Sequence, residues 1–406
     1  MDNVNVVAPR LYELIRLQGD ENDGKLVRNI SFKGITFIYT DRLPEDKWPE
    51  IWMTRQWENP DAAIYMTGVE GCSITDCRIL HSGSYGITLN HYAQNNTIEK
   101  CEIGWTGSGG VFLEGYGPGT LDVNRNNKVL RNYIHDHGLG NYWHCTNVQL
   151  YQSGDNHIAY NILANSAYSG ISMIGVKYDE VHDRRYFFPE YKVGEYLWWK
   201  QYQIRSHDFP KEIQDGIRNG TFKFDRETIK PYLYARNNLV EYNIITEPHL
   251  KLYEGGSIYA YAIGKWNKWL NNVTFKSTGM PGSSIHALDA LAEFTTIKGN
   301  VYWINGPILC GVGARSDERG NDISGNVRVN CREEFKEQMP HGYGLWYRND
   351  TGRESLDSLV NVIKLKVDSM GGWPKGYVID IPSSENGLPK LEKQYEFPKG
   401  AHFTIE

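Results

Sequence analysis

Short runs in which apolar and polar residues alternate, separated by Gly and Asn, recur along most of the chain. Alternation with a period of two is typical of β-strands, whereas an amphipathic helix repeats every 3.6 residues. Within these runs one six-residue phrase returns, with a large apolar residue third and Cys or Asn sixth. Its copies begin at Cys72, Asn96, Asn127, Asn156, Asn238, Asn267, Thr295 and Asn321, with a plausible first copy at 30–35.

The spacing of these copies predicts the architecture. Their third residues lie 24 to 31 residues apart, except for one interval of 82. A second strand-like phrase follows most copies, at 85–89, 110–113, 147–150, 170–173, 257–261 and 284–288. Repeats of this length are the signature of solenoids. We therefore expect an all-β fold, a right-handed parallel β-helix whose coils stack about 4.8 Å apart. A β-sandwich also alternates, but it would not repeat one phrase in register.

The recurring Asn has a structural explanation. At a bend between strands Asn adopts the left-handed conformation readily, and its side-chain amide can bond to the Asn of the next coil. Cys77 and Cys101 occupy the same position of the phrase. The six cysteines contain no CxxC pair and are too sparse for a disulfide scaffold. We expect them to be buried free thiols.

The repeat also divides the chain. The β-helix domain is expected over 27–333, after an N-terminal lead-in at 1–26 and before a C-terminal capping segment at 334–406. The long interval marks an insertion at about 177–233, which is rich in charged and aromatic residues. Such long insertions are usually lids or docking elements. A helical decoration packed on one sheet is the alternative.

The composition indicates which kinds of molecule this protein binds. The 406 residues are 40% hydrophobic and 23% charged, without the long apolar run of a membrane span. A net charge of −6 argues against nucleic acid or anionic lipid as the main partner. The 41 Gly, 27 Tyr and 12 Trp fit a turn-rich β protein with aromatic surfaces that stack on sugars.

The beginning of the chain shows no secretory signal peptide. We expect a cytoplasmic protein if the chain is complete, and a periplasmic or secreted one if its N-terminus is truncated. The oligomeric state stays open.

Several stretches resemble a known group of proteins. Residues 11–40 read LYELIRLQGDENDGKLVRNISFKGITFIYT, and 114–121, 254–259, 285–289 and 305–322 carry further shared phrases. They are similar to bacterial β-helix proteins related to glycoside hydrolase families 141 and 120, over about residues 8–331. The resemblance implies a carbohydrate-active hydrolase with a catalytic carboxylate at Asp289. It departs from the family pattern where Glu254 replaces Asp and Ala290 replaces a second Asp.

Glycoside cleavage usually needs two carboxyl groups about 5 to 9 Å apart. We expect Asp289 to be the nucleophile or base and Glu254, beside Gly255 and Gly256, to be the acid. Glu254 precedes its strand while Asp289 ends the next, so straight strands in register would hold them about 25 Å apart. Only a folded-back Gly-Gly loop would bring them together.

Other carboxylates and polar groups remain candidates. Glu114 ends a strand on the same edge as Asp289, but about four coils and 19 Å away, and Glu293 follows Asp289 closely. Residues expected to contact substrate lie within or just after repeat strands on consecutive coils: Glu114, His144, Tyr151, Tyr259, His286 and Arg315.

No cofactor or metal is expected. His135 and His137 could share one strand face, but two His without a third ligand make a weak site. No Walker loop, GxSxG elbow, HExxH or Rossmann fingerprint is present. The proposed partner is an oligo- or polysaccharide. The alternatives are a polysaccharide lyase, which would need cations beside a uronate, and a non-catalytic glycan-binding protein.

Overall fold

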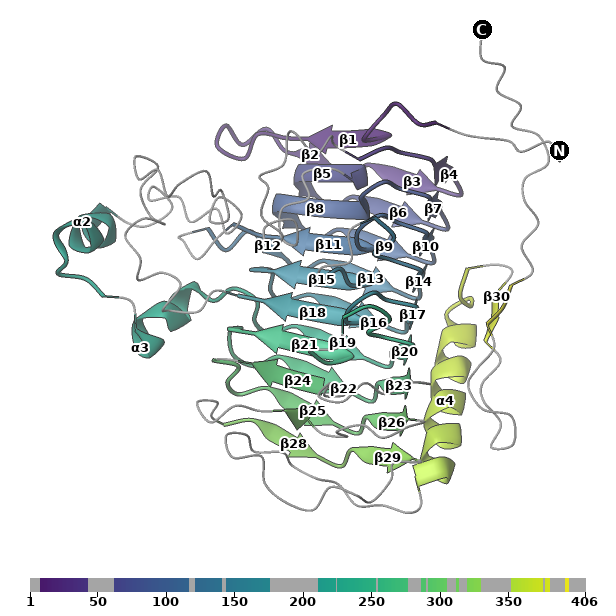
Figure 1. The fold of residues 1–406 in the computed structure, drawn as a ribbon. Helices are drawn as coiled ribbons and strands as arrows, with labels where there is room; N and C mark the ends of the chain where they lie inside the picture. The colour runs from purple at the N-terminus through teal and green to yellow at the C-terminus, as the bar shows by residue number, and fades with distance from the viewer. Residues whose placement is uncertain are drawn as a thin grey trace, which may run out of the picture.

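The computed structural model describes fourteen segments of the chain. They are residues 8–42, 62–116, 121–140, 144–175, 211–223, 225–252, 255–276, 286–289, 291–304, 312–313, 320–329, 352–374, 377–379 and 391–393. Most of them wind into a stack of coils whose strands form three long parallel sheets (Figure 1). This is the right-handed parallel β-helix that the repeat predicts.

Each coil contributes one strand to each sheet. Sheet 1 stacks β1 (Ile15–Gln18), β5 (Ala62–Glu70), β8 (Tyr85–Gln94), β11 (Val111–Glu114), β15 (Val148–Tyr151), β18 (Ile171–Ile174), β21 (Ile258–Tyr261), β24 (His286–Asp289) and β27 (Val312–Gly313), with β2 (Val27–Arg28) and β12 (Asn124–Arg125) beside them. Sheet 2 stacks β3 (Ser31–Lys33), β6 (Ser73–Thr75), β9 (Thr97–Glu99), β13 (Lys128–Leu130), β16 (His157–Ala159), β19 (Leu239–Glu241), β22 (Lys268–Leu270), β25 (Thr296–Lys298) and β28 (Asp322–Ser324). Sheet 3 stacks β4 (Thr36–Ile38), β7 (Arg78–Leu80), β10 (Glu102–Gly104), β14 (Tyr133–His135), β17 (Ile162–Ala164), β20 (Ile244–Thr246), β23 (Val273–Lys276), β26 (Val301–Ile304) and β29 (Val327–Val329).

The repeated phrase corresponds to the strand of sheet 2 and the bend that follows it. Its third residues face one another across the coils and form one interior column: Phe32, Ile74, Ile98, Val129, Ile158, Val240, Trp269, Ile297 and Ile323. The predicted copy at 30–35 is therefore confirmed. Because every coil presents a similar apolar residue at this position, the stack buries a continuous core.

The Asn ladder is confirmed, but its geometry differs from the prediction. Asn243 Oδ1 accepts hydrogen bonds from both the main-chain and the side-chain nitrogen of Asn161, at 3.0 and 2.9 Å, and the same pattern continues to Asn272. The left-handed residue is the one before each ladder Asn, such as Tyr160 and Tyr242. The ladder Asn itself is buried, because its amide must reach the next coil.

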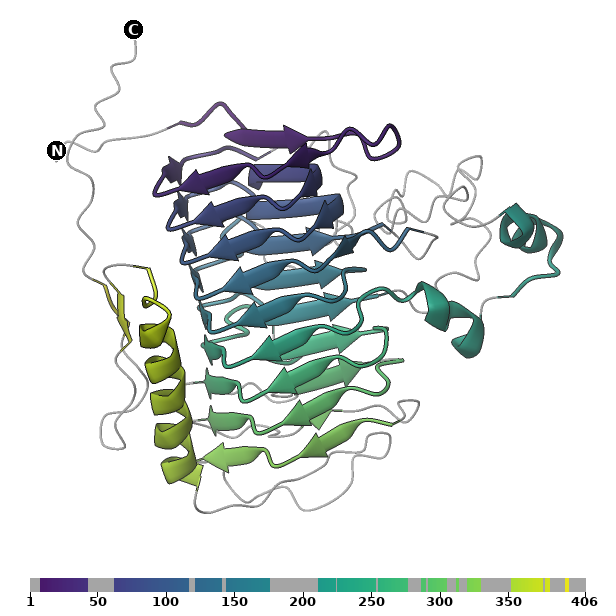
Figure 2. The same ribbon diagram turned by 180° about the vertical axis from the view of Figure 1, so that it is seen from behind.

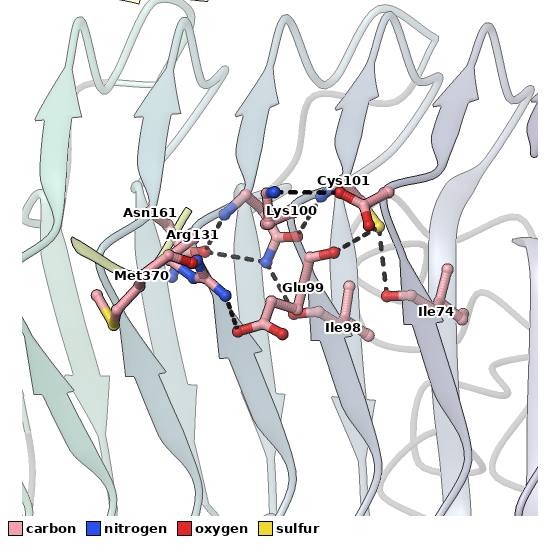
Figure 3. Close-up of polar contacts among 10 residues, drawn as sticks. Ile74, Ile98, Glu99, Lys100, Cys101, Arg131, Asn161 and Met370 are labelled. Carbon is pink, nitrogen blue, oxygen red and sulfur yellow. Dashed lines mark hydrogen bonds and ion pairs between the residues drawn. The ribbon is translucent and has the colours of Figure 1, made fainter. Parts of the chain in front are cut away.

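Thiols replace the amide at two positions of this ladder. Cys101 donates its Sγ–H to the carbonyls of Ile74 and Glu99, at 3.4 and 3.3 Å, and its main-chain nitrogen donates to Asn132 Oδ1 at 2.9 Å (Figure 3). The hydrogen-bonding contact with Cys101 lowers the pKa of the neighbouring Cys77. Among the described residues, Cys72, Cys77, Cys101 and Cys145 are buried thiols that form no disulfide, as predicted. Cys310 and Cys331 lie outside the described part of the chain.

The long helix α4 (Gly352–Ser369) lies alongside the stack (Figures 1 and 2). Its buried residues pack on the outer face of sheet 3, in a cluster with Ile162, Ile244 and Val273. Lys366 Nζ lies 3.9 Å from the centre of the Tyr242 ring. The described part of 334–406 thus runs beside the coils; its remaining strands, β30 (Tyr377–Ile379) and β31 (Leu391–Lys393), form an antiparallel pair.

The end of the predicted insertion packs on sheet 1. It contains α2 (Lys211–Asn219), α3 (Arg226–Ile229) and the 3₁₀ helix η6 (Lys230–Tyr232). These elements project to one side of the stack, and α2 lies farther from the coils than α3 (Figure 2). Ile229 and Leu233 join an apolar cluster with Phe112, Tyr151 and Ile174 on the outer face of sheet 1. Residues 176–210 lie outside the described part.

No helix among the described residues is long and apolar enough to span a bilayer.

Candidate functional site

Two rows of side chains point outward from sheet 1, because the residues between them fill the interior. Row 1 contains, in stacking order, Arg16, Tyr65, Thr88, Phe112, Gln149, Ser172, Tyr259 and Ala287. Row 2 contains Gln18, Thr67, Asn90, Glu114, Tyr151, Ile174, Tyr261 and Asp289. Adjacent members of a row lie one coil, or about 4.8 Å, apart.

Asp289 lies at the end of β24 and is half-buried. Tyr261 is its direct neighbour in row 2, while Tyr259 lies one coil before it in row 1. The Tyr259 hydroxyl reaches diagonally across and donates to Asp289 Oδ2 at 3.0 Å. The structure therefore brings together two of the residues that the sequence predicts for substrate contact and catalysis.

This hydrogen bond has a defined direction. Burial raises the pKa of Tyr259 well above its ordinary value, and the neighbouring Tyr168 and Asp289 side chains raise it further. Tyr259 therefore keeps its proton at neutral pH and donates it to the Asp289 carboxylate. A hydrogen bond of this kind orients a carboxylate and favours its charged form.

Aromatic and imidazole rings surround this pair. The Tyr168 ring meets the Tyr259 ring edge to face, with centroids 5.8 Å apart. The centroid of the His249 ring lies 5.7 Å from that of Tyr168. The centroid of the ring of His144, a predicted site residue, lies 4.6 Å from that of Tyr168. His144 thus belongs to the same cluster as Tyr259 and Asp289.

The Gly255–Gly256 turn packs closely against this cluster. Gly255 has φ +95°, and a Cβ atom there would lie 2.4 Å from Tyr168 Oη. A Cβ on Gly256 would lie 2.6 Å from the main-chain nitrogen of Ala287. Both positions therefore require glycine. Glu254 and Arg315, the predicted acid and a predicted binding residue, lie outside the described residues.

Two predicted substrate-contacting residues are buried. His286 lies in the interior, paired with Ile258, and its Nδ1 is 2.9 Å from the Tyr302 hydroxyl. Its ring also meets Trp269 edge to face, with centroids 5.4 Å apart. Burial lowers the pKa of His286 to about 3. The prediction of a sugar contact at His286 is inconsistent with this place, and the reason is the register: strand β24 begins one residue later than the alternation suggested, which exchanges the two faces.

Tyr151 is also removed from the surface. It lies in row 2 but is buried within the apolar cluster that includes Ile229 and Leu233. The insertion therefore covers the position at which the sequence predicted a substrate contact.

The two spare carboxylates, Glu114 and Glu293, have different surroundings. Glu114 occupies row 2 four coils earlier, at about 19 Å, as predicted, and the buried Tyr151 and Ile174 lie between. Glu293 is buried and forms an ion pair with Lys230 Nζ at 2.9 Å. Glu293 thus anchors η6 of the insertion.

The His135 and His137 side chains do not converge. His135 Nδ1 lies 2.7 Å from Asp136 Oδ2 and its Nε2 lies 3.4 Å from Glu102 Oε1, on the outer face of sheet 3. His137 Nδ1 lies 2.6 Å from the Thr106 hydroxyl, and burial lowers the pKa of His137 to about 3. Within the described segments, no group of His, Cys, Asp or Glu could hold a metal ion.

Sequence reasoning missed Tyr168 and His249. Both come from loops between strands, and no periodicity marks them. Only the fold brings these loops beside Tyr259.

Comparison with known proteins agrees with the fold. Residues 62–182 match the family described as "Right handed beta helix region". No curated protein matches the sequence.

Solved structures with a similar fold include proteins of different kinds. One is described as a glycoside hydrolase, with 16% identity and a TM-score of 0.49, covering 79% of this chain and 51% of that chain. Another is an alginate lyase from Paenibacillus sp. str. FPU-7, with 12% identity and a TM-score of 0.35, covering 66% of this chain and 76% of that one. The surface adhesin PfbA of Streptococcus pneumoniae matches with 9% identity and a TM-score of 0.34, covering 95% of this chain and 84% of that one. This chain spans about half the length of the glycoside hydrolase, and these likenesses concern the fold.

Proposed function

We propose that this protein is a glycoside hydrolase in which Asp289 is the catalytic carboxylate and Tyr259 positions it. The observation that carries the proposal is the 3.0 Å hydrogen bond from Tyr259 Oη to Asp289 Oδ2 inside a cluster of rings. Aromatic rings beside a carboxylate suit a sugar, which offers apolar C–H faces and polar hydroxyls. The resemblance to glycoside hydrolase families 141 and 120 points to the same residue.

In this mechanism the Asp289 carboxylate attacks the anomeric carbon or activates a water molecule. A second carboxylic acid protonates the leaving oxygen, as glycoside cleavage requires. We propose Glu254 for this second role, because the adjoining Gly255 packs within van der Waals reach of Tyr168, which itself contacts Tyr259. In this proposal His144 and His249 bind sugar hydroxyls.

Hydrolysis of a panel of aryl glycosides tests the proposal. We expect wild type to cleave at least one of them, and Asp289→Asn to lower kcat/KM by about a thousandfold or more. Tyr259→Phe should lower it by about ten- to a hundredfold, because Asp289 loses the bond that orients it. Tyr242→Phe is the matched control: it also removes a tyrosine hydroxyl, but beside α4, and it should leave kcat/KM unchanged.

Three outcomes would contradict the proposal. Full activity of Asp289→Asn would exclude its catalytic role. Ultraviolet absorbance of an unsaturated product would indicate a polysaccharide lyase. Binding of saccharides by wild type without hydrolysis would indicate a glycan-binding protein.

A further inference from the structure

Two residues before each strand of sheet 2, the coil turns through a residue with positive φ. This bend column contains one residue from each of nine coils, in stacking order Asn29, Gly71, Asn95, Asn126, Asp155, Asn237, Trp266, Phe294 and Gly320. Asn, Asp and Gly adopt the left-handed conformation readily, whereas a bulky side chain is rare and strained there. Trp266 and Phe294, with φ +65° and +52°, are therefore the two exceptions in the column.

Packing does not explain these two aromatic residues. At another bend Tyr160 and Tyr242 also have positive φ, but their rings stack with centroids 5.3 Å apart and contact Lys366 of α4. Trp266 is 59% exposed and Phe294 41%, and no other Trp, Phe or Tyr among the described residues is as exposed as either. An exposed ring gains little from burial, so the strained backbone at both positions has no compensation from packing.

The surroundings of Phe294 orient its ring. The ring lies against the main chain of the next coil, because a Cβ on Gly320 would be 2.5 Å from Phe294 Cε1. Lys265 Nζ lies 4.9 Å from the centre of the same ring. Trp266 belongs to the preceding coil, and its main-chain nitrogen donates to the Phe294 carbonyl at 3.2 Å. Trp266 and Phe294 thus form one exposed patch, the aromatic corner.

The aromatic corner lies on the two coils that carry the candidate site. Tyr261 and Asp289 are neighbours in row 2, and Trp266 and Phe294 each follow one of them by five residues. Five residues span at most about 17 Å, so the main chain of the corner lies within that distance of Asp289. The 3₁₀ helix η6 packs on the segment between them. A chain that reaches both places would therefore run past η6.

The polar groups beside the rings indicate the kind of ligand. The two preceding coils place the half-buried Asp155 and the exposed Asn237 in the same column, and Lys265 adds a positive charge. A sugar can stack its C–H face on an exposed ring and bond through its hydroxyls to a neighbouring amide, carboxylate or ammonium group. The core of a protein interface is instead depleted of charged residues. The corner therefore suits a saccharide better than a protein partner.

We propose that Trp266 and Phe294 form a surface site that binds a polysaccharide chain and holds it near Asp289. The choice of a saccharide rests in part on the proposed function, because the corner shares its two coils with Tyr259 and Asp289. Both rings are exposed, so a polymer can reach them from solvent.

Affinity electrophoresis of the Asp289→Asn protein in gels that contain xylan, galactomannan or alginate tests the proposal. We expect at least one polymer to retard the protein, and the added changes Trp266→Asn and Phe294→Asn each to raise its Kd about tenfold. Four other coils have Asn at this bend, so both variants should fold. Trp266→Tyr should keep most of the affinity, since it keeps a ring. Leu365→Asn, which removes an exposed apolar side chain of α4, is the matched control and should leave retardation unchanged.

Thermal unfolding separates binding from folding. Because asparagine tolerates positive φ better than an aromatic residue does, the Tm of Trp266→Asn and of Phe294→Asn should equal or exceed that of the parent protein. A clear fall in Tm with unchanged retardation would show that the rings serve only the fold, and would overturn the proposal.

The readout needs no cleavage, so it is independent of the proposed function. Retardation that depends on Trp266 and Phe294, in a protein whose wild type cleaves no aryl glycoside, would support the aromatic corner while the hydrolase proposal fails. Retardation that both substitutions leave unchanged would overturn the inference, as would absence of retardation by all three polymers. A dimer that Trp266→Asn dissociates in sedimentation, without retardation by any polymer, would assign the corner to a contact between copies and overturn it as well.

Discussion

Adjacent residues of one bend meet opposite structural demands. Asn238 is buried, and its Oδ1 accepts from the main-chain and side-chain nitrogens of Asn156 at 3.0 and 2.9 Å. Asn237, directly before it, is exposed and has φ +54°. Position 238 therefore needs an amide side chain, whereas position 237 needs only a residue that tolerates the left-handed conformation.

We predict that Asn238→Ala lowers the free energy of unfolding by roughly 2 to 5 kcal/mol, because it leaves buried donors of Asn156 without an acceptor. Asn237→Gly, the control, should change it by less than about 1 kcal/mol, since glycine adopts positive φ freely. Urea unfolding followed by tryptophan fluorescence measures both. Equal losses in the two variants would refute the ladder as a source of stability.

The buried imidazoles predict a dependence of stability on pH. Burial lowers the pKa of His137 and of His286 from 6.5 to about 3 in the folded protein. Below pH 6.5 the unfolded chain binds protons at these residues and the folded protein does not, so stability falls as the pH drops from 6.5 towards 3. The fall is about 1.4 kcal/mol per pH unit for each histidine.

His286→Gln isolates one of these contributions while retaining a polar partner for Tyr302. We expect its free energy of unfolding to fall less steeply with acid than that of wild type, by about 1.4 kcal/mol per pH unit. Urea titrations at several pH values between 4 and 7 provide the comparison. Parallel curves for the two proteins would contradict the buried neutral state of His286.

Among the elements, α4 contributes apolar packing to sheet 3. Its buried side chains, Leu356, Val360, Ile363 and Val367, lie on one face of the helix. At its end Trp373 Nε1 donates to the Tyr160 carbonyl at 2.7 Å, and Arg131 bonds to the Met370 carbonyl and to Glu99 (Figure 3). Removal of α4 would therefore expose an apolar sheet face.

We predict that Ile363→Asp releases α4 and lowers the free energy of unfolding by about 3 kcal/mol or more, because an unpaired charge enters the contact with sheet 3. Leu365→Asp, two residues further at a position that is 70% exposed, should change it by no more than about 0.5 kcal/mol. Thermal unfolding monitored by circular dichroism distinguishes them. Equal melting temperatures would show that α4 packs weakly.

The insertion depends on one buried ion pair at its end. Lys230 and Glu293 are 2.9 Å apart, and the Glu293 side chain is 3% exposed. We predict that Lys230→Met speeds chymotrypsin cleavage within 211–233 several-fold, because Glu293 keeps a buried charge without its partner. Lys223→Met, at an exposed position of the same segment, should not. Identical cleavage rates in both variants would argue against an anchoring role.

For the whole molecule, the period of the sequence was sufficient to predict the fold. Each copy of the phrase places an apolar residue inside and an amide at the bend, so stacking is the arrangement that satisfies all copies together. The predicted lead-in, β-helix and capping boundaries stay predictions. The αL position was assigned one residue too late, because the sequence shows the amide but not which residue makes the turn.

The candidate site was predictable only in part. A strand end marks Asp289, Tyr259 lies within the repeat strand before it, and the common row of Glu114 and Asp289 follows from the period alone. The rings of Tyr168 and His249 reach the site from loops, which carry no periodic signal. His286 was misplaced because alternation fixes a strand's faces only after its first residue is known.

The interior of the later coils has a consequence for how the chain winds. A ladder of identical amides would tolerate a slip by one complete coil, since each Asn would find an equivalent partner. Trp269, His286 and Tyr302 occupy columns otherwise filled mainly by smaller residues such as Val240, Ile258 and Thr274. A shift of the chain by one coil would place these bulky side chains at interior positions that fit aliphatic side chains. The differing sizes of the interior side chains thus favour one register of the coils, although the amide ladder itself is repetitive.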